Sequence, residues 1–183
     1  TGPGEPVEMK PPGLFPANVY GWLGPDQYML IGYLPGKKYQ CFAYDLPKNN
    51  LRPVCPEGIP DATRFFLSPD HKLFLSPSPG QGWTIYPVDG GPPQPVKIDP
   101  SEAVIGWRAD SRSLYVRPDR ENSDRIAVSV LDLATGQRTA WKEIHPAQPV
   151  LEIHQLNITP DGRAYAYNYV LIQSDLYIAK GLP

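Results

Sequence analysis

Four segments of this 183-residue chain repeat one short pattern, in which an apolar strand-like run leads into a turn that ends in aspartate. The four aspartates are Asp26, Asp70, Asp110 and Asp161, and they are separated by 44, 40 and 51 residues. An apolar residue lies three positions before each aspartate, and another lies four positions after it. The residues at the earlier position are Leu23, Leu67, Trp107 and Ile158. Because apolar side chains at fixed places on both sides of a turn are typical of a β-hairpin, the repeat predicts four hairpins along the chain.

A second aspartate follows the first in three of the four units. Asp45 and Asp89 each lie 19 residues after the first aspartate of their unit, and Asp132 lies 22 residues after it. Each ends a third apolar run and begins a turn, after which a short fourth run follows. Four antiparallel strands in about 40–50 residues are the period of a propeller blade. The sequence therefore predicts an all-β fold, a β-propeller with four four-stranded antiparallel blades, over a β-sandwich, which has no reason to repeat its turn chemistry.

The proline content agrees with this fold. The chain contains 24 prolines and 16 glycines, and a proline inside a helix removes a backbone donor and clashes with the preceding turn. Many short strands joined by tight turns accommodate such a composition. We expect one domain over residues 1–183, with blades at approximately 14–57, 58–99, 100–144 and 150–183.

The two ends of the sequence bear on how the ring closes. The fourth unit stops after its third strand, and residues 1–10 read like the turn and fourth strand of a blade, so we expect them to complete the last blade. Closure of this kind removes exposed sheet edges. Three assemblies remain open: a four-bladed ring, two chains that form an eight-bladed ring, and half of a larger propeller. Since a half-ring exposes two apolar sheet faces, a homodimer is one expectation.

The two cysteines belong to the first unit. Cys41 lies in its predicted third strand, and Cys55 follows its fourth. A turn symmetric about Lys48 would place Asp45 opposite Leu51, and the same register would place Cys41 opposite Cys55. Cα atoms of such cross-strand pairs are about 4.5 Å apart at non-hydrogen-bonded sites, near the short end of disulfide geometry. The alternatives are a disulfide, in the periplasm or outside the cell, and two separate buried thiols.

Charge and composition exclude several classes of function. A net charge of −2 with scattered basic residues disfavours nucleic acid as a partner. No apolar run approaches the roughly 18 residues of a membrane helix, so we expect no membrane insertion. The three histidines, His71, His145 and His154, share no short metal-binding spacing. We therefore expect no metal and no cofactor.

No motif in the sequence points to catalysis. A Gly-x-Ser-x-Gly elbow and a glycine-rich phosphate loop are both absent. The four turn aspartates are expected to be structural, because aspartate in a turn accepts hydrogen bonds from nearby backbone amides. Loops are the expected interaction surface. The residues that we expect to contact a partner are Arg120, Glu121, Asp124, Arg125, Trp83 and Trp141.

The repeat resembles a known group of proteins. The turns Ser68-Pro69-Asp70 and Thr159-Pro160-Asp161-Gly162, each followed by an apolar strand, resemble the bacterial TolB-like, WD-related propeller repeat. Units one and three depart from it, with Gly24-Pro25-Asp26 and Arg108-Ala109-Asp110. The ending, from Ser174 to Leu182, is similar to the C-terminal ends of propeller sensor domains on bacterial membrane Ser/Thr protein kinases. The resemblance implies the fold but no single function, because such propellers serve many roles.

Together these features predict a non-catalytic binding or sensor module. The resemblance implies a piece of a larger receptor-type protein on the periplasmic or extracellular side of a membrane, with a protein or small molecule as its ligand. One alternative is the propeller portion of a prolyl-oligopeptidase-type hydrolase, which controls access of substrate to a separate catalytic domain. Another is a scaffold in an envelope complex.

Overall fold

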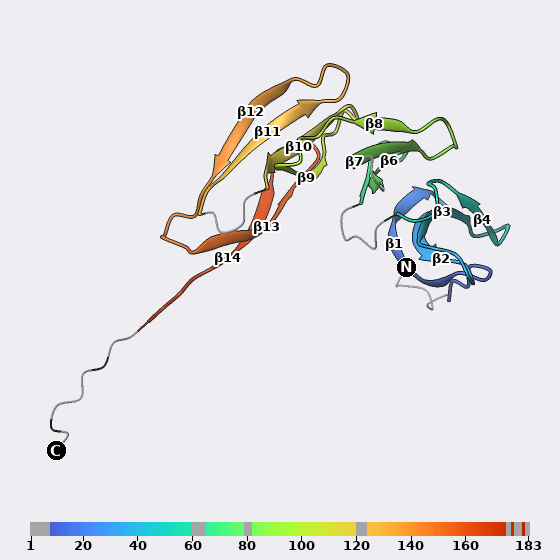
Figure 1. The fold of residues 1–183 in the computed structure, drawn as a ribbon, viewed down its shortest axis with the longest axis horizontal. Coiled ribbons are helices and arrows are strands. Elements are labelled where there is room, and N and C mark those ends of the chain that lie inside the picture. Colours follow the sequence, from blue (N-terminus) through green and yellow to red (C-terminus); the bar gives the residue numbers. More distant parts are fainter. Residues whose placement is uncertain are drawn as a thin grey trace, which may run out of the picture.

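The fold is all-β, with strands arranged in propeller-like blades (Figure 1). The computed structural model describes residues 8–59, 65–78, 82–119, 124–174, 177 and 181. These residues form fourteen strands and contain no helix, and so no helix that could cross a membrane. The strands make three four-stranded antiparallel sheets and one two-stranded sheet, each from consecutive strands.

Each sheet begins with the strand that precedes one of the repeated turns. The first sheet contains β1 (Phe15–Gly24), β2 (Gln27–Tyr33), β3 (Gln40–Asp45) and β4 (Asn50–Pro53). The second contains β5 (Phe66–Leu67), β6 (Leu73–Ser78), β7 (Gly82–Pro87) and β8 (Gln94–Val96). The third contains β9 (Glu102–Trp107), β10 (Ser113–Pro118), β11 (Ile126–Asp132) and β12 (Arg138–Ile144). The fourth contains β13 (Glu152–Ile158) and β14 (Tyr165–Val170).

One apolar core fills each interface between consecutive sheets. The side chains alternate along each strand, so a central strand supplies one core on each of its faces. On β6, Phe74 packs toward the first sheet and Leu75 toward the third. On β10, Leu114 packs toward the second sheet and Tyr115 toward the fourth. Full burial of one such side chain stabilises the fold by about 1.5–3 kcal/mol.

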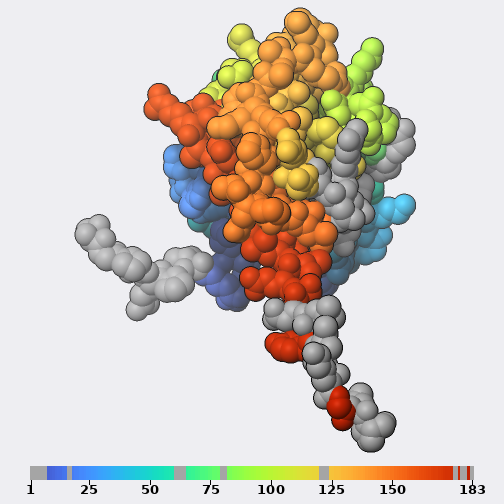
Figure 2. Space-filling model, turned by 90° about the vertical axis from the view of Figure 1, so that its left-hand side faces the viewer, coloured from blue at the N-terminus to red at the C-terminus, as the bar shows by residue number. Residues whose placement is uncertain are grey.

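The third core joins the outer part of the third sheet to the fourth. Val128 and Ile144 of the third sheet are buried together with Ile153 and Leu156 of β13. Figure 2 shows this side of the molecule, with the orange residues of β12 next to the orange-red residues of β13 and β14. The first strands of the sheets also contact one another in chain order, β1 with β5, β5 with β9 and β9 with β13. The sheets therefore follow one another in space in the same order as in the sequence.

The register of the β3–β4 hairpin differs by one residue from the prediction. Asp45 lies opposite Asn50, and Tyr44 lies opposite Leu51, so the turn is not symmetric about Lys48. Asn49 adopts a left-handed φ of 47°, which lets the chain reverse one residue earlier than expected.

Cys41 and Cys55 nevertheless form a disulfide, with their Cα atoms 5.2 Å apart. The Val54 backbone amide donates a hydrogen bond to the Cys41 carbonyl at 2.9 Å. Cys55 lies two residues beyond the end of β4, and its Sγ atom accepts a hydrogen bond from the Cys41 backbone amide at 2.9 Å. Both cysteines are buried in the core between the first and second sheets.

The predictions for the chain ends fall mostly outside the described residues. The strand expected at 1–10 includes residues 1–7, which lie outside them, and residues 8–10 contain no strand. The third strand expected in the fourth unit lies at 175–179, of which only Tyr177 is described.

The face of the fourth sheet that points away from the third carries both polar and apolar side chains in the described residues, with Asn168 between Ala166 and Val170 along β14. Leu156 and Tyr167 pair across the strands and pack toward the third sheet. On the opposite face, the Asn168 Oδ1 atom accepts a hydrogen bond from the Gln155 backbone amide at 2.8 Å. Ala166 lies two residues before Asn168 on this face. The expectation of an apolar face at this end stays a prediction, because the third strand expected in this unit lies mostly outside the described residues. Assembly of two chains into an eight-bladed ring stays a prediction.

Candidate ligand-binding site

The second and fourth repeated turns are closed by the same hydrogen bonds. The Ser68 hydroxyl donates to Asp70 Oδ1 at 2.6 Å and accepts from the Leu73 amide at 2.9 Å. The Thr159 hydroxyl donates to Asp161 Oδ1 at 2.6 Å and accepts from the Ala164 amide at 3.1 Å. Each carboxylate also accepts from the backbone amide two residues further on. The geometry that these two turns share fixes where the first strand of the second sheet and that of the fourth sheet end.

The other two turns use different contacts. Asp110 accepts from the amides of Arg112 and Ser113, both at 2.9 Å, and from the Ser113 hydroxyl at 3.0 Å. The first turn is shorter, since Gly24 pairs directly with Gln27. Asp26 contributes there through its backbone carbonyl, which accepts from the Leu46 amide at 2.9 Å.

These hydrogen bonds lower the pKa of the carboxyl groups of Asp70, Asp110 and Asp161. Burial raises the pKa of Asp70, but hydrogen bonds from Ser68, the Lys72 amide and Ser111 outweigh burial and hold it below the ordinary value. For Asp161, the Thr159 hydroxyl and the Arg163 amide lower the pKa. The aspartates therefore stay ionised at neutral pH, as acceptors that hold the turns.

Hydrogen bonds between turns bring the first strands together. The Asp70 amide donates to Ser111 Oγ at 3.2 Å, and the Ala109 amide donates to the Pro160 carbonyl at 2.8 Å. Between the second and third sheets, Trp107 Nε1 donates to the Phe66 carbonyl at 3.0 Å. The ends of β5, β9 and β13 are thus held side by side.

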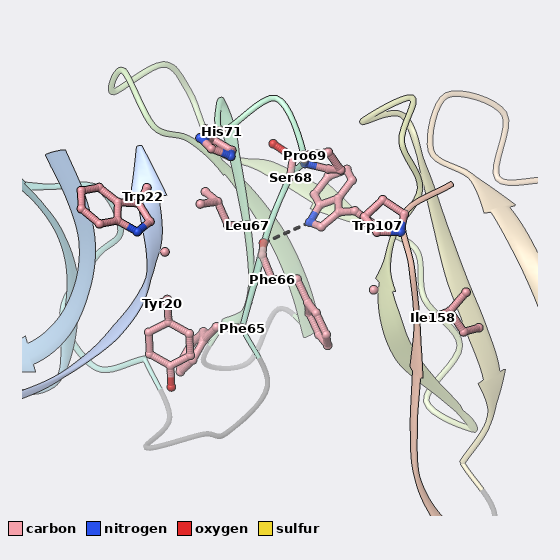
Figure 3. Close-up of a pocket in the computed structure, with 13 residues that line it drawn as sticks. Tyr20, Trp22, Phe65, Phe66, Leu67, Ser68, Pro69, His71, Trp107 and Ile158 are labelled. Carbon is pink, nitrogen blue, oxygen red and sulfur yellow. Dashed lines mark hydrogen bonds between the residues drawn. The ribbon is translucent and has the colours of Figure 1, made fainter. Parts of the chain in front are cut away.

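A pocket of about 440 Å³ opens at this point (Figure 3). All four sheets contribute to its lining, through β1, β5 with the turn that follows it, β9, and the end of β13. Figure 3 shows Trp22 and His71 toward one end of the pocket, and Tyr20 and Phe65 toward the other. Trp107 lies between the second and third sheets, where its indole nitrogen is tied to the Phe66 carbonyl.

The lining of this pocket is aromatic and uncharged. Apart from the His71 imidazole, no acidic or basic side chain is among the described residues that line it. Trp22 is 54% exposed, whereas Trp107 is 4% exposed, so the first is available to a ligand and the second forms the floor. Gly106 leaves open space where a side chain would project. Apolar walls with few polar groups are typical of ligand sites.

One hydroxyl group of the pocket, that of Ser68, is held by its own turn. The Ser68 hydroxyl, which is 1% exposed, is occupied by Asp70 and the Leu73 amide. Nucleophilic catalysis requires a hydroxyl that a base can deprotonate and that can reach a substrate. No cluster of metal-binding side chains occurs in the part of the chain that the structure describes.

The residues expected from the sequence to bind a partner lie in separate places. Arg125 lies 3.6 Å from Glu143, and both line a pocket of about 300 Å³ together with Asp124. Trp83 packs against Phe66 between the second and third sheets. Arg120 and Glu121 lie outside the described residues.

Trp141 lies apart from these residues, between Tyr115 and Tyr165, and lines a further pocket on the third sheet. None of the described residues in the predicted set lines the pocket at the first strands.

The positions around the repeated aspartates, rather than the loops, mark the pocket in the sequence. Of the apolar residues three positions before the repeated aspartates, Leu67, Trp107 and Ile158 all line it. In the first unit the neighbouring residue, Trp22, takes this place. The shorter first turn accounts for the offset.

Comparison with known proteins identifies the fold. No protein-family model matches the chain, and no curated protein matches it at a significant level. Among solved structures, TolB from Acinetobacter baumannii is similar with a TM-score of 0.50 and 19% identity, over 76% of this chain and 34% of that one. A protein assigned as TolB from Agrobacterium tumefaciens gives 0.53 and 15%, over 86% and 60%. An oligogalacturonate lyase from Vibrio parahaemolyticus gives 0.52 and 11%, over 67% and 38%.

These similarities show a TolB-like β-propeller, as the repeated turns predict. At 11–19% identity they establish the fold alone. The chain spans between about a third and three fifths of the length of the structures it matches.

Proposed function

We propose that this chain is a non-catalytic binding module of a larger receptor-type protein, and that its ligand occupies the aromatic pocket at the first strands. The observation that carries the proposal is the convergence of uncharged aromatic side chains from separate sheets on one pocket, with Trp22 exposed to solvent. An exposed tryptophan at the mouth of an apolar pocket is a typical binding anchor.

The disulfide supports a location outside the cytoplasm. Cys41 and Cys55 are bonded to each other, and disulfides persist in the periplasm and outside the cell rather than in the reducing cytosol. The sequence from Ser174 to Leu182 resembles the ends of kinase sensor domains. On this resemblance we include a sensor role in the proposal.

The described residues of the lining include no acidic side chain and no basic one besides His71, which restricts the ligand. A charged group entering the pocket would lose its hydration without gaining an opposite charge. The ligand is therefore expected to present an uncharged, apolar or aromatic surface to Trp22 and Tyr20, with one polar group in reach of His71.

The four tryptophans provide a direct test, because each lies in a different environment. Trp22 and Trp107 line the pocket, Trp83 lies in a core between sheets, and Trp141 lies on the third sheet. The experiment is a titration of the ¹⁵N-labelled chain with a pool of tripeptides whose N-termini are acetylated and C-termini amidated, and which are rich in leucine, proline and aromatic residues. We expect the indole signals of Trp22 and Trp107 to shift while that of Trp83 does not.

Two results would contradict the proposal. One is a pool that shifts neither pocket tryptophan at millimolar concentration. The other is cleavage or modification of the peptides during the titration, detected by mass spectrometry, which would show that the chain converts what it binds.

A further inference from the structure

Arg108 breaks the pattern of the repeated turns. It occupies the position at which Ser68 and Thr159 close the second and fourth turns with their hydroxyl groups. In the third turn the closing hydroxyl comes from Ser113, which donates to Asp110 Oδ2 at 3.0 Å. The turn therefore does not need the guanidinium group of Arg108.

The guanidinium group is also poorly paired where it lies. Its Nε atom is buried and has no hydrogen-bond partner among the described residues. The nearest carboxylate oxygen, Asp110 Oδ2, lies 3.9 Å from Nη1, which is beyond hydrogen-bond distance. The group lies over the ring of Tyr115, with Cζ 5.9 Å from the ring centroid. A buried donor without a partner destabilises a fold, so the packing of this turn gives no reason for an arginine at this position.

A polar pocket of about 560 Å³ lies beside this group. Its lining comes entirely from the third sheet and its turns, on the side toward the fourth sheet. Besides Arg108, the side chains that can contact a ligand are those of Asp110, Asp132, Thr135, Gln137, Thr139 and Trp141. Although Trp107 and Arg108 are adjacent in sequence, they line different pockets.

The charges in this pocket disfavour an anionic ligand. Two carboxylates, Asp110 and Asp132, accompany one guanidinium group, and hydrogen bonds hold the pKa of both aspartates below the ordinary value. Asp132 Oδ1 accepts from the Ala134 and Thr135 amides and from the Thr135 hydroxyl. These bonds leave Oδ2 of Asp132 as an acceptor for a ligand.

The remaining groups fit a neutral ligand with many hydroxyls. Arg108 supplies donors only, Asp132 supplies an acceptor, and the amide of Gln137 supplies both. The half-buried Trp141 adds a flat apolar ring beside them. A sugar presents both kinds of surface, because its hydroxyls both donate and accept and its C–H groups form apolar faces.

We propose that this pocket is a binding site for a neutral saccharide, separate from the pocket at the first strands. Arg108 donates to sugar oxygens through the Nη atoms at the end of its side chain, which is 40% exposed, and not through the buried Nε. Asp132 accepts from a sugar hydroxyl, and Trp141 packs against the C–H face of the ring. The pocket volume lies within the range of sites for small ligands.

The test is an array of neutral oligosaccharides built from glucose, galactose, mannose and N-acetylglucosamine, followed by titration of the glycan bound most strongly. Arg108→Ser restores the residue of the second turn, so the variant is expected to fold, with an unchanged or raised melting temperature. We expect it to weaken glycan binding at least tenfold. Arg112→Ser, at an exposed arginine outside the pocket, is the matched control and should bind as the parent does.

Two further measurements keep the test decisive if Arg108→Ser unfolds. Gln137→Ala alters a side chain that lines the pocket in an exposed turn, and should weaken binding severalfold. In the ¹⁵N-labelled chain, the bound glycan should shift the indole signal of Trp141 and leave those of Trp22 and Trp107 unchanged.

The proposal is overturned if no neutral glycan binds above the level of the Arg108→Ser variant, or if acidic glycans bind more tightly than neutral ones. A shift at Trp22 in place of Trp141 would also overturn it, because the glycan would then occupy the other pocket. The peptide titration reports on Trp22 and Trp107, so failure of either proposal can be recognised without the other.

Discussion

Replacement of Gly162 by alanine tests whether the repeated turns lock consecutive sheets together. Gly162 follows Asp161 in the fourth turn and has a φ of 70°. A Cβ atom at this position would lie 2.6 Å from Tyr115 Oη and 3.6 Å from Trp141 Nε1, both in the third sheet. Tyr115 is 1% exposed, so its ring has little room to move away.

Two effects add up in this variant. An L-residue in the left-handed region costs about 1–2 kcal/mol, and forcing a methyl group into a packed site costs a further 1–3 kcal/mol or so. Gly136→Ala is the matched control, since Gly136 has a φ of 72° and nothing within 4 Å of the added Cβ. We therefore expect Gly162→Ala to be less stable than Gly136→Ala by about 1–3 kcal/mol.

Thermal and urea unfolding of both variants measure this difference. At roughly 3 °C per kcal/mol for a chain of this size, Gly162→Ala should melt about 3–9 °C below Gly136→Ala. Equal losses in the two variants would show that backbone strain explains both, and that the contact of the fourth turn with the third sheet contributes nothing.

The disulfide, the turn carboxylates and the Trp107 hydrogen bond each predict a measurable change in stability. The double variant Cys41→Ser/Cys55→Ser should lose about 3 kcal/mol of unfolding free energy, the value for a closed loop of about 15 residues. The loss should appear as a lower urea midpoint, and reductant should lower the midpoint of the parent by the same amount. An unchanged midpoint would contradict this prediction. Because the folded-state pKa values of Asp70 and Asp161 are lowered, their stabilisation is complete above the ordinary value of 3.8 and lost as pH falls through the lower folded values. The melting temperature of the parent should accordingly fall steeply below about pH 4, and that of Asp161→Asn should fall less steeply. Identical dependence of the melting temperature on pH in the two proteins would argue against a stabilising role of the Asp161 carboxylate. Trp107→Phe removes the donor to a backbone carbonyl of the second sheet and should cost about 1–2 kcal/mol in urea unfolding.

The hairpins of this fold could be predicted from the sequence because the turn chemistry is local. The hydroxyl and carboxylate of Ser68 and Asp70, or of Thr159 and Asp161, meet within one turn, and the apolar residues around them set the strands. Register at the β3–β4 turn could not be predicted in the same way. It depends on the left-handed conformation of Asn49, which the residue type permits but does not require.

The candidate site could be predicted only in part, because it is assembled from strands far apart in the sequence. The repeat marks Leu67, Trp107 and Ile158 as equivalent positions, but only the arrangement of the sheets shows that they meet. Loop position and residue type also fail to distinguish an exposed aromatic side chain from a buried one, and Trp83 proves to pack between two sheets.

If the aromatic pocket at the first strands binds the ligand as proposed, removal of its exposed tryptophan should weaken binding. The most direct measurement compares, by titration calorimetry, the affinity of the parent, Trp22→Ala and Val19→Ala for the tripeptide that shifts the Trp22 signal most. Val19 is an exposed residue of the same strand that lies outside the pocket. We expect Trp22→Ala to bind at least tenfold more weakly, a loss of about 1.4 kcal/mol, and Val19→Ala to bind within about twofold of the parent. Equal affinities of Trp22→Ala and the parent would contradict the claim.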